Sequence, residues 1–519
     1  MSDTELRNRA DQDWSKRETV GRFIRDVLIV AVVLAAGFGF YWKSQKDAVQ
    51  ANKIAKEAKD LILLDNPKDF YAAEKKLQEV LGIDSSHGYA LSALAELNAI
   101  LAFEHKVDAR RADAEKYTGL AMKEDPRVAE QYSAHALLLL GNGKANEAAD
   151  FIQKELLDKN AGAPRVFNAF GKAVKRQGKL DVARRSLKGA QDSDWRNPRF
   201  AADLAENYLE DGDLTNALIT YGKGLSANPD HLLSKIGRAR VAILRGENLK
   251  EASDVLAEVL ARPAEELTPN LKARAIGARA ELRLYEGAAA EAIADAEAAV
   301  KEDPTYAPAY RVKAIALARN KDAAAVEAFD KAIATDPNVA LFYYDASATL
   351  IAAGLDQAKA IAYLEKYPLA KDDRYFVKYG DALRGLGRLD DALVQYNKAI
   401  EENGLNAPAH LSKALVLMDK NATNEKADWT EAQTELDYAV GAQEMYPDAY
   451  LARGRLQFIQ KKYVEGAAEY AQALQQLRTL KAPRERLTAI VDQVKQEMLK
   501  AKERDMAKMW DQEATALIR

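Results

Sequence analysis

Two patterns of apolar and polar residues divide the chain. The first is a run of 16 uncharged, almost wholly apolar residues from Val27 to Trp42. The second begins after residue 50, where small and bulky apolar residues recur four and seven positions apart, the spacing of one face of an α-helix. Together they predict a helical chain with one long apolar segment near its beginning. The sequence has no alternating pattern typical of β-strands.

The apolar run predicts a transmembrane helix over residues 27–42, preceded by a tail of residues 1–26. A membrane-spanning helix needs about 17–25 apolar residues. Phe23 and Ile24 lengthen the run, and the charged side chains of Arg25 and Lys43 can reach the polar interfaces at its two ends. We therefore expect a single uncleaved span that anchors the protein in a membrane.

Two alternatives to a span remain open. A cleaved signal peptide is disfavoured because the 26-residue leader is long and mixed in charge, and no small-x-small site precedes Lys43. A buried core helix is not normally apolar on all sides. The 20 residues before the run hold six Lys or Arg and the 20 after it hold five, which slightly favours a cytoplasmic N-terminus. We expect a bacterial inner-membrane protein with its bulk in the periplasm; a cytoplasmic orientation is the alternative.

A repeat with a period of about 36 residues follows. One copy reads Gly212, Ala217, Tyr221, Gly224 and Pro229. Small residues at the first and third helical positions let a preceding antiparallel helix approach closely, and the larger residue between them fills the gap. The upstream Gly allows a tight turn. The same spacing recurs at Ala183/Leu187/Ala190, Ala292/Ala296/Ala299, Ala325/Phe329/Ala332 and Ala392/Tyr396/Ala399.

This pattern resembles the tetratricopeptide repeat, a helix–turn–helix unit of 34 residues. A degenerate first-helix signature is visible in several copies, for example at Phe376, Tyr379, Gly380 and Leu383. The resemblance implies an all-α fold, a right-handed α-solenoid of about 11–12 helix–turn–helix repeats over residues 43–482. A HEAT-type solenoid is the runner-up. Two units, 230–269 and 408–447, are longer than the others.

The chain past Pro483 leaves this pattern. Leu487, Ile490, Val491, Val494 and Met498 form one apolar stripe on an otherwise charged helix. We interpret residues 483–519 as a capping helix, with one face for the last repeat and one for water. A partner-binding helix is the alternative.

Composition explains the repeat and excludes several chemistries. Close to one residue in five is Ala, as close helix packing requires, and there is no Cys for disulfides, thiol nucleophiles or lipidation. The net charge of −4 argues against nucleic-acid binding. The five His residues are scattered, and no metal, nucleotide or hydrolase motif is present. We therefore predict no enzyme activity, no cofactor, no metal and no small-molecule substrate.

The resemblance implies a protein ligand, because stacked first helices of such repeats line a concave groove. Counting from the well-aligned units, we predict that an apolar, Tyr-bearing stretch runs into a charged one. That combination suits a bound peptide or helix. These groove residues are Tyr310, Leu317, Tyr344, Ile351, Arg374, Val377, Asp381 and Arg384. The alternative for Tyr310 and Tyr344 is that they only cover neighbouring helices.

A cluster of basic residues stands out in one unit, where a single acid, Asp181, lies among them. The cluster could meet an anionic lipid or an acidic partner. Alternatively, it is a solvated ridge neutralised by the acidic unit that follows. Its members are Lys172, Lys175, Arg176, Lys179, Arg184, Arg185 and Lys188.

These features lead to two functional hypotheses. In the first, the chain is a membrane-anchored scaffold or adaptor that holds protein partners in a bacterial envelope complex. Its layout is similar to that of the periplasmic ancillary subunits of the protein translocon, a likeness that bears on compartment more than on partner. In the second, the solenoid faces the cytoplasm and serves as an assembly or regulatory factor for a secretion or motility machine, or for a membrane enzyme.

Overall fold

The chain is described by a computed structural model. It covers residues 3–159, 162–367, 371–421, 424, 427–443, 445–480 and 482–518; residues 1, 2 and 519, at the ends of the predicted tail and cap, lie outside them. Within these ranges the secondary structure is helical and no strand occurs. The all-α prediction is confirmed.

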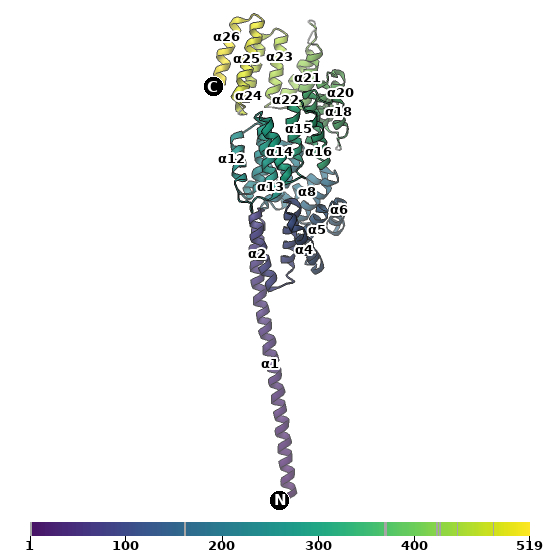
Figure 1. Cartoon of the computed structure of the whole chain (residues 1–519), viewed down its shortest axis with the longest axis vertical. Helices are drawn as coiled ribbons and strands as arrows, with labels where there is room; N and C mark the ends of the chain where they lie inside the picture. Colours follow the sequence, from purple (N-terminus) through teal and green to yellow (C-terminus); the bar gives the residue numbers. More distant parts are fainter. Residues whose placement is uncertain are drawn as a thin grey trace.

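The first helix, α1 (Asp3–Ile62), is 60 residues long and projects from the body of the molecule (Figure 1). The residues from Val27 to Trp42 are exposed along it. Burial begins at Ala51, and Ala55, Ala58 and Ile62 continue the same helical face against the body. The apolar segment and the first repeat therefore share one unbroken helix.

The described chain continues as antiparallel pairs, in which an A helix is followed by a B helix. α1 pairs with α2, and eleven further pairs extend from α3 to α24. The A helices are α3 (Gly88–Ala99, extended by Ile100–Glu104), α5 (Ala129–Gly141), α7 (Pro164–Arg176), α9 (Pro198–Glu210), α11 (Leu232–Arg245), α13 (Pro269–Tyr285), α15 (Ala307–Arg319), α17 (Ala340–Ala353), α19 (Asp373–Gly385), α21 (Ala407–Lys420) and α23 (Pro447–Ile459). The B helices are α2 (Pro67–Ile83), α4 (Arg111–Glu124), α6 (Ala145–Glu155), α8 (Leu180–Ser193), α10 (Leu214–Ala227), α12 (Leu249–Leu260), α14 (Ala289–Glu302), α16 (Ala324–Thr335), α18 (Gln357–Glu365), α20 (Leu389–Glu402), α22 (Thr430–Ala442) and α24 (Tyr463–Thr479).

The repeat spacing fits this packing. The Tyr221 ring is fully buried, and a Cβ added to Gly237 of the next A helix would lie 2.1 Å from its Cζ. Tyr396 lies in the same way over Gly380, at 2.5 Å. Only Gly leaves room for the aromatic ring at these points. At the turn between α9 and α10, Gly212 has φ +79°, a conformation that Gly adopts without strain.

The two longer units differ in where their extra residues lie. In 230–269 the addition is residues 261–268, between α12 and α13. In 408–447 it is the connection 421–429 between α21 and α22, of which residues 422, 423, 425 and 426 lie outside the described residues.

The single capping helix predicted for residues 483–519 is wrong in one respect. The segment forms two helices, α25 (Arg484–Lys500) and α26 (Arg504–Leu517). Four residues of the predicted stripe, Leu487, Val491, Val494 and Met498, are buried, and the fifth, Ile490, is partly buried against them. The Trp510 indole of α26 is 4% exposed and donates to the Val491 carbonyl oxygen at 2.9 Å. Because α26 also carries apolar residues at helical spacing, it covers the stripe as a B helix would.

Candidate functional site: the axial cavity and the groove beyond it

The helix pairs wind into a superhelix whose successive turns touch. Asn228 Nδ2 donates to the Leu64 carbonyl oxygen at 2.6 Å across 164 residues. His105 Nδ1 lies 2.9 Å from Thr268 Oγ1, and Asn338 Nδ2 donates to the Lys175 carbonyl oxygen at 3.2 Å, each pair 163 residues apart. This recurring separation, between about four and five repeats, defines one turn.

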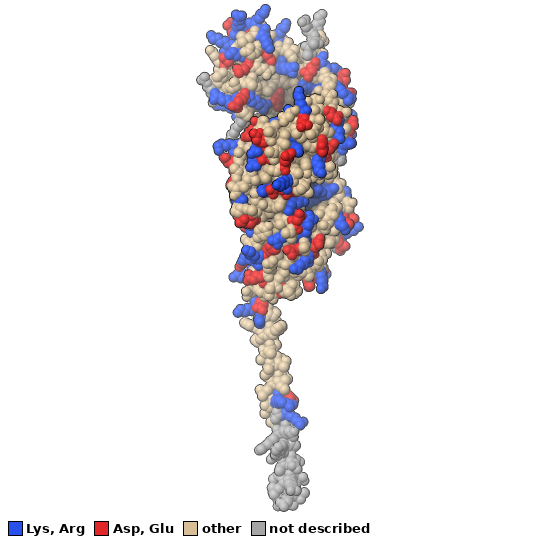
Figure 2. All heavy atoms as spheres, viewed as in Figure 1, with Lys and Arg blue, Asp and Glu red and all other residues tan. Residues whose placement is uncertain are grey.

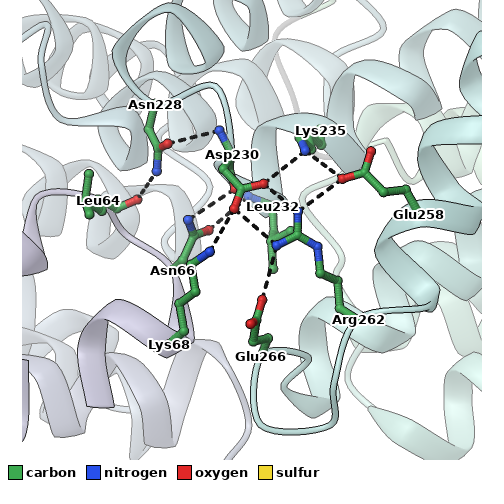
Figure 3. Close-up of polar contacts among 10 residues, drawn as sticks. All are labelled: Leu64, Asn66, Lys68, Asn228, Asp230, Leu232, Lys235, Glu258, Arg262 and Glu266. Atoms are coloured by element: carbon green, nitrogen blue, oxygen red, sulfur yellow. Dashed lines mark hydrogen bonds and ion pairs between the residues drawn. The ribbon is translucent and has the colours of Figure 1, made fainter. Parts of the chain in front are cut away.

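Loop residues form the first of these contacts, shown in Figure 3. Asn66 Nδ2 donates to the Asp230 carbonyl oxygen at 3.1 Å, and its Oδ1 accepts from the Leu232 N–H at 3.0 Å. Asn66 is 2% exposed. Since both ends of its amide are used, the loop after α1 is fixed to the loop before α11.

Asp230 forms ion pairs with cationic side chains from two consecutive turns of the superhelix. Its carboxylate pairs with Lys68 at 3.0 Å, Lys235 at 3.0 Å and Arg262 at 2.5 Å (Figure 3). The hydrogen bond from Arg262 is the largest cause that holds the pKa of Asp230 well below its usual range. Arg262 belongs to the connection 261–268, so the extra length of that unit serves the turn contact.

A cavity of about 330 Å³ lies on the inner side of the superhelix. The A helices α5 to α17 and the loops between them supply most of its wall. Among the described residues eight cationic and six anionic side chains line it, namely Lys106, Arg111, Lys172, Lys175, Arg176, Arg199, Arg240 and Arg274 with Asp65, Glu104, Asp203, Glu206, Glu210 and Asp336.

Arg199 is the buried centre of one part of this wall. Its Nε donates to Asp65 Oδ1 at 2.7 Å and its Nη1 donates to Glu104. Lys172 Nζ then joins Glu104, at 2.6 Å, to Asp203, at 2.8 Å. Burial alone would raise the pKa of Glu104, but the Lys172 and Arg199 cations outweigh it and lower that pKa to about 2. The network is therefore charged at neutral pH.

A second set of charges connects successive A helices. Glu281 accepts from Arg240 Nε at 2.9 Å and from Arg311 Nη1 at 2.9 Å, and Arg311 also pairs with Asp345. At the other end Arg240 lies 3.8 Å from Glu206. These charges of alternating sign join α9, α11, α13, α15 and α17. Glu206 and Arg240 are 34 positions apart, as are Arg311 and Asp345. Opposite charges separated by one repeat length are therefore a sequence signal that could have revealed these ion pairs.

The predicted basic cluster does not form one surface. Lys172 and Lys175 line the cavity and pair with acids, Lys175 with Glu210. Arg184 pairs with Asp211 at 2.6 Å and Lys188 pairs with Asp192. Arg176 lies exposed at the cavity, whereas Lys179 and Arg185 are exposed outside its wall. Most of the cluster is thus neutralised, largely by the acidic unit that follows it.

The predicted apolar groove residues pack within the solenoid. Leu317 and Ile351 contact the buried cluster around Phe329, and Tyr344 stacks on Tyr367 with ring centroids 5.1 Å apart. The Tyr310 hydroxyl donates to the Pro304 carbonyl oxygen at 3.2 Å. Each of these side chains therefore has intramolecular contacts that a partner would share or replace.

The predicted polar groove residues are brought close to other charges. Arg374 pairs with Asp211 at 3.0 Å, across one superhelical turn. Asp381 accepts from the Tyr396 hydroxyl at 2.9 Å and from Ser412 at 3.1 Å. Val377 is buried in the core.

Beyond the cavity the A-helix charges are more exposed. Arg384 of α19 pairs with Asp419 of α21 at 2.7 Å, and Arg455 of α23 lies 3.7 Å from the same carboxylate. The exposed fractions of the three side chains are 31%, 31% and 48%. Figure 2 shows a hollow below the C-terminal helices. We call Arg384, Asp419 and Arg455 the groove triad.

The groups with the largest structural roles were not predicted as site residues. Arg199, Asp230 and Glu281 act between segments far apart in sequence. Among the described residues no group of three His, Asp or Glu side chains is placed to hold a metal ion. The absence of a cofactor and of catalysis stays a prediction.

Comparison with known proteins supports the repeat assignment. A tetratricopeptide-repeat family model matches residues 168–231 and 425–479. No curated protein matches. The solved Cut9–Hcn1 hetero-tetramer of the APC/C is similar at 14% identity over 87% of this chain and 84% of that chain, with a TM-score of 0.42. The human IFIT1 dimer with m7Gppp-AAAA is similar at 16% identity over 73% of this chain and 89% of that chain, also with a TM-score of 0.42.

The family matches fall in two separate parts of the solenoid. They contain α8–α10 and the α22–α24 region, whose helix pairs are continued by the other pairs of the described chain. The chain is thus a helical-repeat protein that carries tetratricopeptide repeats.

Proposed function

We propose that the chain is a membrane-anchored scaffold that holds protein partners against its concave surface. One observation carries the proposal: the exposed apolar segment continues without a break into the first repeat. Within the described residues one helical stretch, Arg22–Ile62, is long and apolar enough to cross a membrane, with a mean hydropathy of 2.1 in its most apolar window. None of that window is buried by the rest of the chain.

The groove triad supports a partner site in the C-terminal repeats. Its charged side chains are partly exposed, so they can orient a bound peptide or helix through ion pairs and hydrogen bonds. Tyr310 and Tyr344, on the preceding repeats, would supply apolar contacts to the same partner. Tetratricopeptide repeats are typically interaction scaffolds, and a long inner surface suits that role. We propose Arg384 as the central partner-binding residue.

Photo-crosslinking in native membranes tests this site. A crosslinking amino acid at position 384 is expected to form covalent adducts with a partner protein, identified by mass spectrometry. The matched control is position 394 on α20, where Val394 is 50% exposed and no groove was predicted. The same adducts from both positions, or none from position 384, would contradict a partner in this groove.

We also propose that the anchor lies in a bacterial inner membrane with the solenoid in the periplasm. The slight excess of positive residues before the apolar segment and the lack of Cys support this orientation. A C-terminal alkaline phosphatase fusion is expected to be active and to resist extraction by carbonate. An inactive but membrane-bound fusion would favour the cytoplasm-facing assembly factor instead, and a soluble fusion would reject the anchor.

A further inference from the structure

Two cations at the axial cavity have no ion-pair partner among the described residues. Of the eight cationic side chains in its wall, six form ion pairs with acids, Arg111 with Asp108 outside the wall. Lys106 and Arg176 make no ion pair or hydrogen bond through their side chains with any described residue. The wall holds two more positive than negative side chains. Because acids outside the wall pair with Arg111 and Arg240, the wall cations that lack an ion pair are Lys106 and Arg176.

The neighbourhood of Lys106 is poor in free acids. Burial lowers the pKa of its ammonium, the Asp303 carboxylate partly opposes this effect, and the Arg176 and Arg111 cations lower the pKa further. Asp303 already accepts hydrogen bonds from Asn270 at 2.7 Å and from the Thr305 hydroxyl at 2.7 Å. Lys106 and Arg176 are thus held near Arg111 without an ion pair of their own to any described residue.

The position of these cations is fixed by contacts between turns. The carbonyl oxygens of Lys175 and Arg176 accept from Asn338 Nδ2, which ties the end of α7 to the loop before α17. The Asn270 N–H donates to the His105 carbonyl oxygen at 3.2 Å, beside Lys106. These backbone contacts therefore hold the chain at Lys106 and Arg176 in place in the cavity wall.

We infer that the axial cavity binds a small, soluble, phosphate-bearing anion through Lys106, Arg111 and Arg176. Arginine and lysine bind phosphate oxygens by charge-assisted hydrogen bonds, and a dianion would give Lys106 and Arg176 the ion-pair partner that each lacks among the described residues. The volume of about 330 Å³ lies at the small end of ligand pockets and suits a small molecule.

The distance from the apolar segment argues against a lipid headgroup as the ligand. Asp65, which lines the same cavity, follows the end of α1, and 20 residues of helix separate Trp42 from Ile62. At 1.5 Å per residue this places the cavity about 30 Å from the end of the apolar segment. The site is independent of the proposed groove, so either can fail without the other.

Calorimetry with pyrophosphate tests the inference on the full-length protein in nanodiscs of neutral lipid. Pyrophosphate is expected to bind and to raise the melting temperature. Lys106→Gln and Arg176→Gln are each expected to weaken binding about tenfold, which corresponds to the loss of one charge-assisted contact. Because each substitution removes a repelling charge, neither is expected to lower the melting temperature of the unliganded protein.

Lys179→Gln is the matched control, since Lys179 is exposed near Arg176 but outside the cavity wall. It should leave the affinity within twofold. The inference is overturned if the wild type does not bind pyrophosphate, if the double variant K106Q/R176Q binds as the wild type does, or if K179Q weakens binding equally. Competition by anionic lipid in the nanodiscs would overturn the assignment to a soluble ligand.

Discussion

Replacement of Arg199 by Ala is expected to detach the first repeats from the second superhelical turn. The side chain is 8% exposed and bridges Asp65 and Glu104, with Phe70 beneath its guanidinium at 5.8 Å. Removing one partner of a buried ion pair typically costs about 3–5 kcal/mol, because the remaining charge is left without compensation. Hydrogen exchange should then show lost protection in the loop after α1.

The control for this prediction lies in the connection just before α9, the helix that carries Arg199. Arg196 is 73% exposed at its side chain and approaches Asp194 only at 3.7 Å. Arg196→Ala should change the free energy of unfolding by no more than about 0.5 kcal/mol. Arg199→Lys should restore stability in part, since one ammonium cannot reach both carboxylates as a guanidinium does. Unchanged protection in Arg199→Ala would show that the turns are held together elsewhere.

Glu281→Ala is expected to destabilise the middle of the solenoid by a similar amount, about 3–5 kcal/mol. Arg240 is 4% exposed and Arg311 is 6% exposed, and both depend on this carboxylate. Without it two buried cations face each other across neighbouring A helices. Urea unfolding followed by circular dichroism measures the loss.

Two further variants test whether unpaired buried charge, rather than substitution as such, lowers the stability of Glu281→Ala. Glu297→Ala is the matched control, because Glu297 is 57% exposed at its side chain and pairs with Lys313 on the surface. It should be nearly neutral. Replacement of Glu281, Arg240 and Arg311 together by Met is expected to recover part of the stability, since the two buried cations are removed together with their shared carboxylate. Glu206 keeps Arg274 at 3.0 Å, and the Asp345 side chain is 26% exposed to water. If the triple variant is as unstable as Glu281→Ala, unpaired charge is not the reason.

The repeat itself could be predicted from the sequence because its causes are local. Ala217, Tyr221 and Gly224 lie within one helix, and their spacing alone determines which face can meet a neighbour. The same holds for Phe329 and Tyr396, whose place in the repeat predicts packing between helices and whose side chains are buried.

The winding of the superhelix could not be predicted in this way. It depends on contacts between residues more than 160 positions apart, such as that of Leu64 with Asn228. The predicted groove assumed an open concave surface throughout. Where consecutive turns touch, that surface becomes a cavity, and residues assigned to a partner instead meet the chain itself, as Arg374 meets Asp211.

The unbroken course of α1 couples the apolar segment to the solenoid in rotation as well as in distance. Each residue of a helix adds about 100° of rotation. One residue inserted between Trp42 and Ala51 would therefore rotate the whole solenoid, with its groove and cavity, by about 100° about the α1 axis relative to the apolar segment. An insertion of seven residues, about two helical turns, would nearly restore the original orientation of the solenoid. It would also move the solenoid about 10 Å further from the apolar segment along the helix axis. The number of residues between the apolar segment and the first repeat therefore fixes the rotation of the solenoid about the α1 axis. That rotation determines the direction in which the groove and the cavity open.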